Sequence, residues 1–320
     1  MIEKRGKKAS EIEYKNDKQW INSIPLKLEK ITGKVVLLDF WAYSCVNCVR
    51  TLPALKKIWN KYKKKRFIMI GIHTPEFEFE KEIGNVKYAV KKHGIDWPIL
   101  SDPERNNWEN YGNTYWPRAA VIDSNGNVIF EHVGESGYDE IDNVIYEELR
   151  KMGEFIGENE NDEKIEEKKK YAVSMSRETY AGSLRGSEIS GLSCTKEGCD
   201  EYVDSGVHET GKIYLQGMWK RKKEYLEYVG KDYEGWISFR FYAKEVNSVI
   251  GGVGKAEVEL EGIAVNKINK SLEIAIENGK TVVKVEGADM YNIVKIEDYH
   301  SMDLKIKAFN GMKVYAYTFG

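Results

Sequence analysis

The sequence has little of several features that mark particular classes of protein. Its 320 residues include only four cysteines and six prolines, so the chain is not a small toxin or growth factor held together by disulfides. Lysine and arginine (49) do not outnumber aspartate and glutamate (51), which argues against nucleic acid as the main partner. The longest apolar run, residues 35–46, is interrupted by Asp39 and is shorter than the about 20 residues of a membrane-crossing helix. A globular protein with room for about two domains remains.

The N-terminal residues lack the apolar middle segment of a secretory signal, so the chain is expected to be cytoplasmic. An extracytoplasmic location is retained as the alternative, because a chain from which a signal has been removed would look the same. Charged residues reach 31% and glutamine occurs only at Gln19 and Gln216, a bias similar to that of hyperthermophile proteins. Intracellular disulfides do occur in such organisms, so the cysteines alone do not fix the compartment.

The first part of the chain alternates between two kinds of pattern. Apolar runs of strand length are followed by segments in which apolar residues recur at helical spacing. The strand-like runs are 35–41, 67–72, 119–122 and 128–133, and the helical segments are 49–62, 79–93 and 141–151. Strands and helices in alternation predict an α/β domain.

A segment of different composition divides the chain. Almost every residue of 153–170 is polar or charged. Glutamate and lysine four residues apart pair well on a helix, so this segment is predicted to be either a solvated helix or a flexible linker. It separates a first domain, residues 20–152, from a second domain, residues 171–320.

The second part follows the pattern of β-strands. Polar and apolar residues alternate in seven segments: 236–243, 255–260, 272–276, 280–285, 293–296, 302–308 and 313–319. Such segments predict an all-β sandwich. The pairs Asn278-Gly279 and Asn310-Gly311 stand between segments of this kind, as hairpin turns require.

The sharpest chemical signal is the pair Cys45 and Cys48, which follows the apolar run 35–41 and precedes the helical segment 49–62. At the start of a helix, unpaired N–H groups and the helix dipole favour the thiolate, and the pKa of such thiols falls to about 3.5–7.5. A second cysteine on the first helical turn reaches the first sulfur and resolves a mixed disulfide. The alternatives are half of a zinc site and a buried apolar pair. Zinc requires further ligands, and no second pair of the needed kind follows, so a redox role is preferred.

Residues 39–48, DFWAYSCVNC, resemble the active-site segment of the thioredoxin family. The resemblance implies a mixed central sheet flanked by helices, attack by Cys45 and resolution by Cys48. In that family an acid six residues before the first cysteine is buried and assists proton transfer from the resolving cysteine, and Asp39 stands at that position. The alternative for Asp39 is a surface acid at the end of a strand. Asn47 replaces the proline of thioredoxin itself, which leaves the redox potential and the direction of electron flow open.

A second matching landmark is Trp116-Pro117, directly before an apolar strand. Thioredoxin-like proteins carry a cis proline there, facing the cysteines, and the resemblance implies that Pro117 shapes a groove for an extended substrate segment. It also implies that Trp41, Tyr43 and Trp116 flank the thiols as an apolar rim for a protein substrate. Core packing is the alternative for the two tryptophans.

The resemblance extends to the TlpA/DipZ-type branch and covers about residues 20–152. The segments that carry it are residues 43–45 (YSC), 73–77 (HTPEF) and 115–117 (YWP). His73 ends a strand-like run and is interpreted as a hydrogen-bonded structural residue rather than a catalytic base.

The second part resembles the carbohydrate-binding-module-like jelly roll that follows DipZ-type thioredoxins, on the segments 176–182, 239–247 and 315–320. Docking of a protein substrate or partner is the preferred role of this domain, and binding of a glycan is retained as an alternative. A glycan would stack on exposed aromatic side chains, for which five are candidates: Trp219, Tyr225, Tyr228, Tyr233 and Trp236.

Cys194 and Cys199 lie in a stretch rich in glycine and serine and are predicted to form a local structural disulfide. Closing so short a loop contributes roughly 2 kcal/mol by the chain-entropy relation. The alternative is a relay pair that exchanges electrons with Cys45 and Cys48.

These observations predict a two-domain thiol:disulfide oxidoreductase whose partners are protein disulfides or dithiols and a redox donor protein. No metal or organic cofactor is implied, because the cysteines themselves carry two electrons. The alternative function is a binding module in which the β-sandwich recognises glycan or protein and the first domain is a scaffold.

Overall fold

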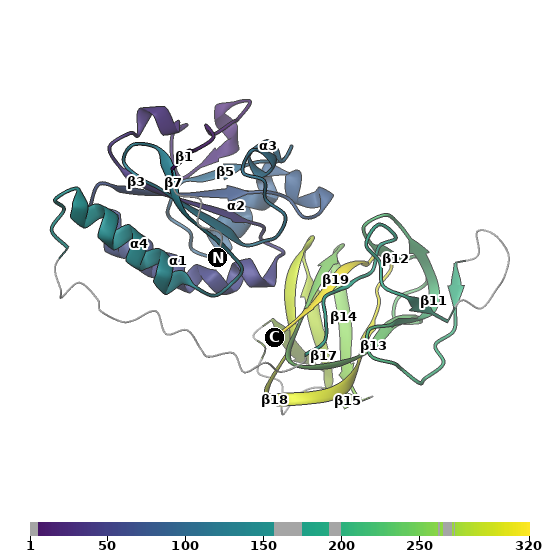
Figure 1. Ribbon diagram of the computed structural model, residues 1–320. Helices are drawn as coiled ribbons and strands as arrows, with labels where there is room; N and C mark the ends of the chain where they lie inside the picture. Colours follow the sequence, from purple (N-terminus) through teal and green to yellow (C-terminus); the bar gives the residue numbers. More distant parts are fainter. Residues whose placement is uncertain (1–5, 157–174, 192–199, 262, 265–270, 272) are drawn as a thin grey trace. The chain divides into compact units, whose positions relative to one another are not determined.

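The computed structural model describes residues 6–156, 175–191, 200–261, 263–264, 271 and 273–320 (Figure 1). The chain forms two compact units, Met1–Lys169 and Lys170–Gly320. Most of the predicted boundary segment, residues 157–170, lies outside the described residues. No helix in the described part is both long enough and apolar enough to cross a membrane.

Within the described residues, the first unit contains a mixed sheet and helices. Its strands are β1 (Lys7–Lys8), β2 (Trp20–Ile21), β3 (Val35–Trp41), β4 (Phe67–His73), β5 (Ile99–Ser101), β6 (Arg118–Ile122) and β7 (Asn127–Val133). Its α-helices are α1 (Val46–Tyr62), α2 (Ile83–Lys92), α3 (Asn106–Asn110) and α4 (Tyr138–Lys151), and its short 3-10 helices are η1 (Asp17–Gln19), η2 (Leu28–Lys30) and η3 (Glu78–Lys81). The strand order is β1-β7-β6-β3-β4-β5-β2. β4 runs parallel to β3 and to β5, and the other neighbours are antiparallel.

The central strand β3 separates two apolar cores. Successive side chains of a strand point to opposite faces of the sheet. The odd-numbered apolar residues of β3 pack with side chains of α1, α2 and α4, which cover one face. The even-numbered residues pack with Trp108 of α3 and with side chains of the N-terminal segment on the other face. Asp39 is an odd-numbered residue of a fully buried strand, so it points to the side of α1 and α4, which lie next to each other in Figure 1.

The second unit consists of strands within the described residues. They are β8 (Thr179–Tyr180), β9 (Ile189–Ser190), β10 (Glu201–Tyr202), β11 (Ile213–Arg221), β12 (Leu226–Tyr228), β13 (Trp236–Gly251), β14 (Gly254–Leu260), β15 (Ile263–Ala264), β16 (Ile274–Glu277), β17 (Lys280–Val285), β18 (Asp289–Lys307) and β19 (Lys313–Phe319). The main order is β10-β11-β12-β19-β13-β18-β14-β17-β16. All pairs of named strands there are antiparallel except β9 with β11.

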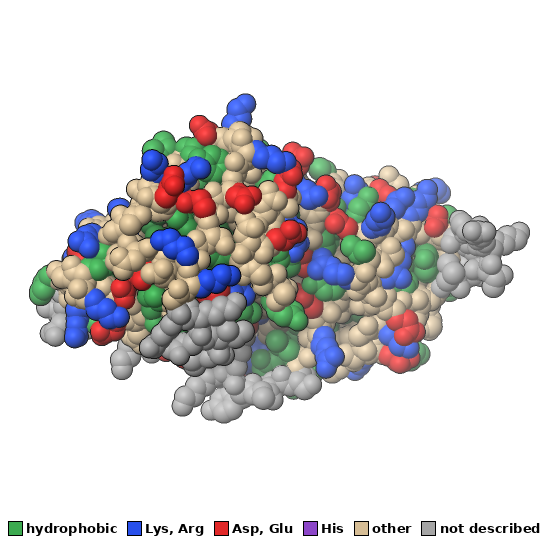
Figure 2. Space-filling view, turned by 45° about the horizontal axis from the view of Figure 1, so that its top comes forward, with side chains coloured by type: hydrophobic (Ala, Val, Ile, Leu, Met, Phe, Trp, Pro, Cys, Tyr) green, Lys and Arg blue, Asp and Glu red, His purple; other side chains and the backbone are tan. Residues whose placement is uncertain are grey.

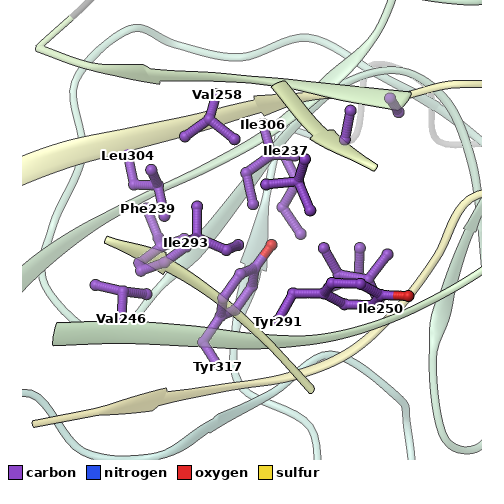
Figure 3. Packing of buried hydrophobic residues seen from close by; sticks show 14 of the residues in the cluster. Ile237, Phe239, Val246, Ile250, Val258, Tyr291, Ile293, Leu304, Ile306 and Tyr317 are labelled. Carbon is purple, nitrogen blue, oxygen red and sulfur yellow. The ribbon is translucent and has the colours of Figure 1, made fainter. Parts of the chain in front are cut away.

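One apolar core lies inside this second unit. Figure 3 shows Ile237, Phe239, Leu304 and Ile306 packed together, and these residues come from the long strands β13 and β18. Tyr317 of β19 adds its ring to the same core, 4.2 Å from the ring of Phe239 between centroids. Apolar burial of this extent is the main source of the unit's stability.

The predicted fold class, an α/β domain followed by an all-β domain, is confirmed. The carbohydrate-binding-module-like jelly roll stays a prediction. Figure 2 shows basic and acidic side chains interspersed over the face in view, as expected for a formal net charge of -2.

Candidate active site

Cys45 and Cys48 lie at the N-terminus of α1. Cys45 is the residue that caps this helix, and its Sγ accepts a hydrogen bond from the backbone N–H of Cys48 at 3.4 Å. That N–H is one of the donors that a helix leaves unpaired at its start, and directing it at sulfur stabilises negative charge there. Cys45 is 7% exposed, whereas Cys48 is 0% exposed. Of the two cysteines, Cys45 is therefore the one that keeps exposed surface.

The thiol of Cys48 is held in its protonated form. Burial raises its pKa well above the ordinary value, and the hydrogen bond and charge of Cys45 add to the increase. The charge of Asp39 raises it further. A thiol attacks disulfides as thiolate, so Cys48 must lose a proton before it can act as a nucleophile.

Asp39 is buried on β3, with 1% of its surface exposed. Its Oδ1 has no hydrogen-bond partner among the described residues. Burial raises the pKa of this carboxyl to about 7. Since its charge acts on Cys48, Asp39 is a group near the thiols that can hold or release a proton at neutral pH.

Pro117 directly precedes β6, and the Trp116–Pro117 peptide bond is cis, as the resemblance implied. In the antiparallel register of β3 and β6, Phe40 pairs with Arg118. One residue further, Pro117 comes level with Trp41, at the end of β3 that leads to Cys45. The carbonyl of Pro117 accepts the N–H of Gly134, which fixes this corner of the sheet.

The three predicted rim residues differ in exposure. Trp41 and Tyr43 are buried, 1% and 2% exposed, and both rings contact the ring of His73. Trp116 is half-buried and stacks on Trp108 with 4.1 Å between ring centroids. Its neighbour Tyr115, which was not among the predicted rim residues, is 69% exposed. Surface for a substrate beside Pro117 thus comes from residues 115–116, and the assignment of the rim to substrate binding stays a prediction.

Two further side chains near the thiols come from distant parts of the chain. Tyr138 begins α4 and is buried, and burial, followed by the charge of Asp39, raises its pKa. Glu80 in η3 is fully buried and accepts the N–H of Ser44, the residue before Cys45, at 3.1 Å. Sequence reasoning missed both. The one available signal was the acidic segment 76–80 after His73, in which nothing distinguished Glu80 from its neighbours.

The remaining candidates lie elsewhere. Cys194 and Cys199 fall outside the described residues. Two of the five aromatic candidates for glycan stacking, Trp219 and Tyr228, are buried in the core of the second unit, so they are not available to a ligand. The other three keep exposed surface. No group of three His, Cys, Asp or Glu side chains arranged to hold a metal ion occurs within the described ranges.

The difference between the two cysteines gives a first testable prediction. Iodoacetamide at pH 7 is expected to label Cys45 of the reduced protein at least about tenfold faster than Cys48, because Cys48 is inaccessible and its pKa is raised. Mass mapping of peptides over time measures both rates, and the unfolded protein, in which the two rates should converge, is the control. Faster labelling of Cys48 would contradict the arrangement.

Two family models match separate parts of the chain. Residues 7–145 match the family model described as Redoxin, and residues 176–320 match the one described as Thioredoxin like C-terminal domain. The chain is 29% identical over 307 residues to Protein DipZ of Mycobacterium bovis, covering 94% of this chain and 41% of that protein. It is 35% identical over 142 residues to the chloroplastic Protein SUPPRESSOR OF QUENCHING 1 of Arabidopsis thaliana, covering 44% of this chain and 14% of that protein.

A shorter relative matches the first unit alone. Thiol-disulfide oxidoreductase YkuV of Bacillus subtilis is 27% identical over 125 residues, which cover 39% of this chain and 84% of that protein. The chain spans less than half the length of DipZ and of the Arabidopsis protein. The first unit thus has a thioredoxin fold and is similar to the Redoxin model and to thiol-disulfide oxidoreductases, and Cys45 and Cys48 lie next to each other in it.

Proposed function

We propose that this protein is a thiol:disulfide oxidoreductase that exchanges two electrons with protein substrates through Cys45 and Cys48. The observation that carries the proposal is the difference between the two thiols on one helical turn. Cys45 keeps a small exposed surface and its sulfur receives a backbone N–H, whereas Cys48 is fully buried, with a raised pKa, near a buried acid. One cysteine is thereby suited to attack a disulfide and the other to resolve the product.

In the reducing direction the reaction takes two steps. The thiolate of Cys45 attacks one sulfur of a substrate disulfide, an S–S bond to Cys45 forms, and the substrate disulfide breaks to release one thiolate. Cys48 then loses its proton and attacks Cys45, so that the Cys45–Cys48 disulfide forms and the second substrate thiolate leaves. Two electrons pass from the protein to the substrate, the proton of Cys48 goes to an acceptor in the protein, and the two released thiolates take up protons from solvent. The oxidising direction is the reverse sequence.

Asp39 is the proposed acceptor for the proton of Cys48. Its pKa of about 7 leaves part of the carboxyl ionised at neutral pH, and its charge already acts on Cys48. A base whose pKa lies close to the working pH combines availability with sufficient basicity. The route from Cys48 to the unpartnered Oδ1 is proposed to be direct or through one water molecule.

The proposed docking place for the substrate is the surface around residues 115–117. Tyr115 is a large exposed side chain, and Trp116 adds a half-buried ring next to it. Exposed aromatic side chains beside a reactive group provide contact area for a protein segment.

The reduction potential of the Cys45–Cys48 pair, once measured, shows in which direction electrons flow between the protein and its substrate. A value near about -270 mV indicates a reductase, and one near about -120 mV indicates an oxidant.

The test of the proposal is reduction of insulin by dithiothreitol in the presence of the protein. The wild-type protein is expected to accelerate precipitation of the insulin chains, and Cys45→Ser is expected to lower the rate to that of dithiothreitol alone. The melting temperature of Cys45→Ser shows whether the variant is folded. The proposed function would be excluded if the folded variant and the wild-type protein were equally active. A binding module would be favoured if the wild-type protein had no reductase activity and Cys45→Ser bound a partner as well as wild type does.

A further inference from the structure

Glu80 occupies an unusual environment for an acidic side chain. It is 0% exposed, and no lysine or arginine of the described part pairs with it. Its Oε2 accepts the backbone N–H groups of Glu76 and Phe77, at 2.5 and 3.1 Å. Its Oε1 accepts the N–H of Ser44 at 3.1 Å. A buried carboxylate is costly unless hydrogen bonds satisfy it, and here the donors are all backbone groups.

These hydrogen bonds connect two segments that are remote in sequence. On one side is the loop before η3, and on the other is the turn between β3 and α1. Ser44 immediately precedes Cys45, whose backbone and side chain start the helix. The Glu80 carboxyl therefore lies one peptide unit away from the attacking cysteine and helps to fix the backbone that carries it.

His73 does not neutralise this carboxyl. Its Nε2 is 3.9 Å from Oε1 of Glu80, but burial lowers the pKa of the imidazole to about 3, so the ring is uncharged at neutral pH. Nε2 accepts the N–H of Tyr43 at 3.4 Å, and the ring stacks on that of Tyr43 with 5.3 Å between centroids. His73 thus accepts the backbone N–H of residue 43, and Glu80 accepts that of residue 44. His73 does so without supplying a positive charge.

We propose that Glu80, packed against His73, is a positioning residue that acts through the Ser44 peptide and through its own charge on Cys45, and thereby sets how the thiol–disulfide equilibrium depends on pH. This inference rests on the proposed redox function of Cys45 and Cys48. It adds a second buried acid, from a different part of the chain than Asp39, to the groups that control the pair.

The physical basis is the change of charge near the attacking sulfur. Burial, followed by the charge of Glu76, raises the pKa of Glu80 to about 7, so both forms are populated near neutral pH. The titratable groups that face it are His73 on β4, which is neutral there, and Glu76 on the same loop. An ionised Glu80 opposes a thiolate on Cys45 and disfavours the reduced protein. When Glu80 is protonated, this electrostatic repulsion is absent.

The test compares the wild-type protein with Glu80→Gln, which mimics the protonated acid, at pH 8 and at pH 5.5. Each protein is equilibrated with glutathione buffers, and the reduced fraction is quantified by thiol trapping and mass measurement. At pH 8 the variant is expected to favour the reduced state on the order of tenfold more than wild type, the size of a one-unit pKa interaction and equal to about 30 mV. At pH 5.5, where the wild-type carboxyl is itself protonated, the two proteins are expected to agree.

Asp102→Asn is the matched control. Asp102 is also a buried carboxyl whose pKa is raised and which accepts two backbone N–H groups, but these belong to Asn107 and Trp108 and not to the turn before Cys45. The control should leave the equilibrium as in wild type at both pH values. The inference would be overturned if the reduced fraction of Glu80→Gln equalled that of wild type at pH 8, or if it differed from wild type by the same factor at pH 8 and pH 5.5. It would also be overturned if Asp102→Asn changed the reduced fraction as much as Glu80→Gln does.

Unmodified protein provides a second readout that does not depend on how well the variant folds. By linkage, the carboxyl carbon of Glu80, followed by NMR, should titrate at higher pH in the reduced protein than in the oxidised protein. Equal titration in both redox states would overturn the inference. The equilibrium with glutathione requires only the two cysteines, so the inference can fail while insulin reduction proceeds. It can also hold in a protein that does not reduce insulin.

Discussion

Cys48→Ser is expected to convert a transient mixed disulfide into a stable product. Cys45 in this variant keeps its place at the start of α1 and still attacks a disulfide, but no buried thiol is left to release the substrate. Incubation with an equimolar disulfide-containing peptide should join most of the protein to the peptide, whereas the wild-type protein should retain almost none. Mass measurement under non-reducing conditions gives the fraction, and dithiothreitol should restore the free variant.

The structural reason is that resolution requires a second sulfur close to the first. The thiol of Cys48 is hydrogen-bonded to Cys45 and follows it on the first turn of one helix. Serine retains the size of the side chain but cannot form the intramolecular disulfide. The control is the double variant Cys45→Ser/Cys48→Ser, which should trap no peptide. Trapping by the double variant would show that cysteines other than this pair react, and release at the wild-type rate by Cys48→Ser would contradict the proposed step.

Asp39→Asn is expected to make the protein more stable and less active. Burial raises the pKa of Asp39 from the ordinary 3.8 to about 7, so the folded protein holds a proton that the unfolded chain releases between these values. The free energy of unfolding of the wild-type protein therefore falls as the pH rises from 4 to 7. Above pH 7 the buried charge costs about 4 kcal/mol, and asparagine removes that cost.

Urea denaturation at pH 4 and pH 8 measures this difference. The two proteins should have similar free energies of unfolding at pH 4, and the variant should be more stable by about 4 kcal/mol at pH 8. Its insulin reduction at pH 7 should be slower by about 100-fold, since the proton acceptor for Cys48 is lost. Asp139→Asn, an exposed change on α4, is the control and should behave as wild type. A variant less stable than wild type at pH 8 would show that Asp39 is not a buried charge.

Much of the first unit could be predicted because its central strand is buried on both faces. The apolar run at 35–41 coincides with β3, and the run at 128–133 lies within β7. The helical pattern at 79–93 is instead divided into η3 and α2. Glu80 explains the division, because its carboxylate turns back to accept the N–H groups of Glu76 and Phe77 and closes a short turn before α2 begins.

The second unit shows what alternation alone does not predict. The segment at 293–296 and most of that at 302–308 are parts of one strand, β18. Between them only His300 and Ser301 pair with β13, and the register of the ladder shifts before it resumes at Lys295. The run that forms β11 was missed, and Gly217, with φ of 89°, interrupts its pattern. The turn at Asn278-Gly279 was recognisable, since both residues have the positive φ that a tight hairpin needs.

Some residues of the candidate site could be predicted from the local sequence, and others could not. Cys45, Cys48 and Asp39 belong to one continuous segment, so their proximity follows from a strand that leads directly into a helix. Glu80 and Tyr138 reach the site only through the packing of η3 and α4, which no local pattern encodes. The predicted rim also depended on packing, because Trp41 and Tyr43 are buried in the core on one face of the sheet and contact His73 of the neighbouring strand.

The pairing of β13 with β18 has a consequence for how the chain acquires its structure. Trp236 pairs with Lys307 and Ile250 with Asp289, so the longest ladder of the second unit joins segments with β14 to β17 between them. The entropy of closing that long loop is lost before most of its hydrogen bonds form. The first unit contains such pairings as well, since Val36 of β3 pairs with Ile122 of β6 and Lys7 of β1 pairs with Val128 of β7. Nonlocal topology of this kind slows the search for the native state, so neither unit is expected to be among the fastest-folding domains.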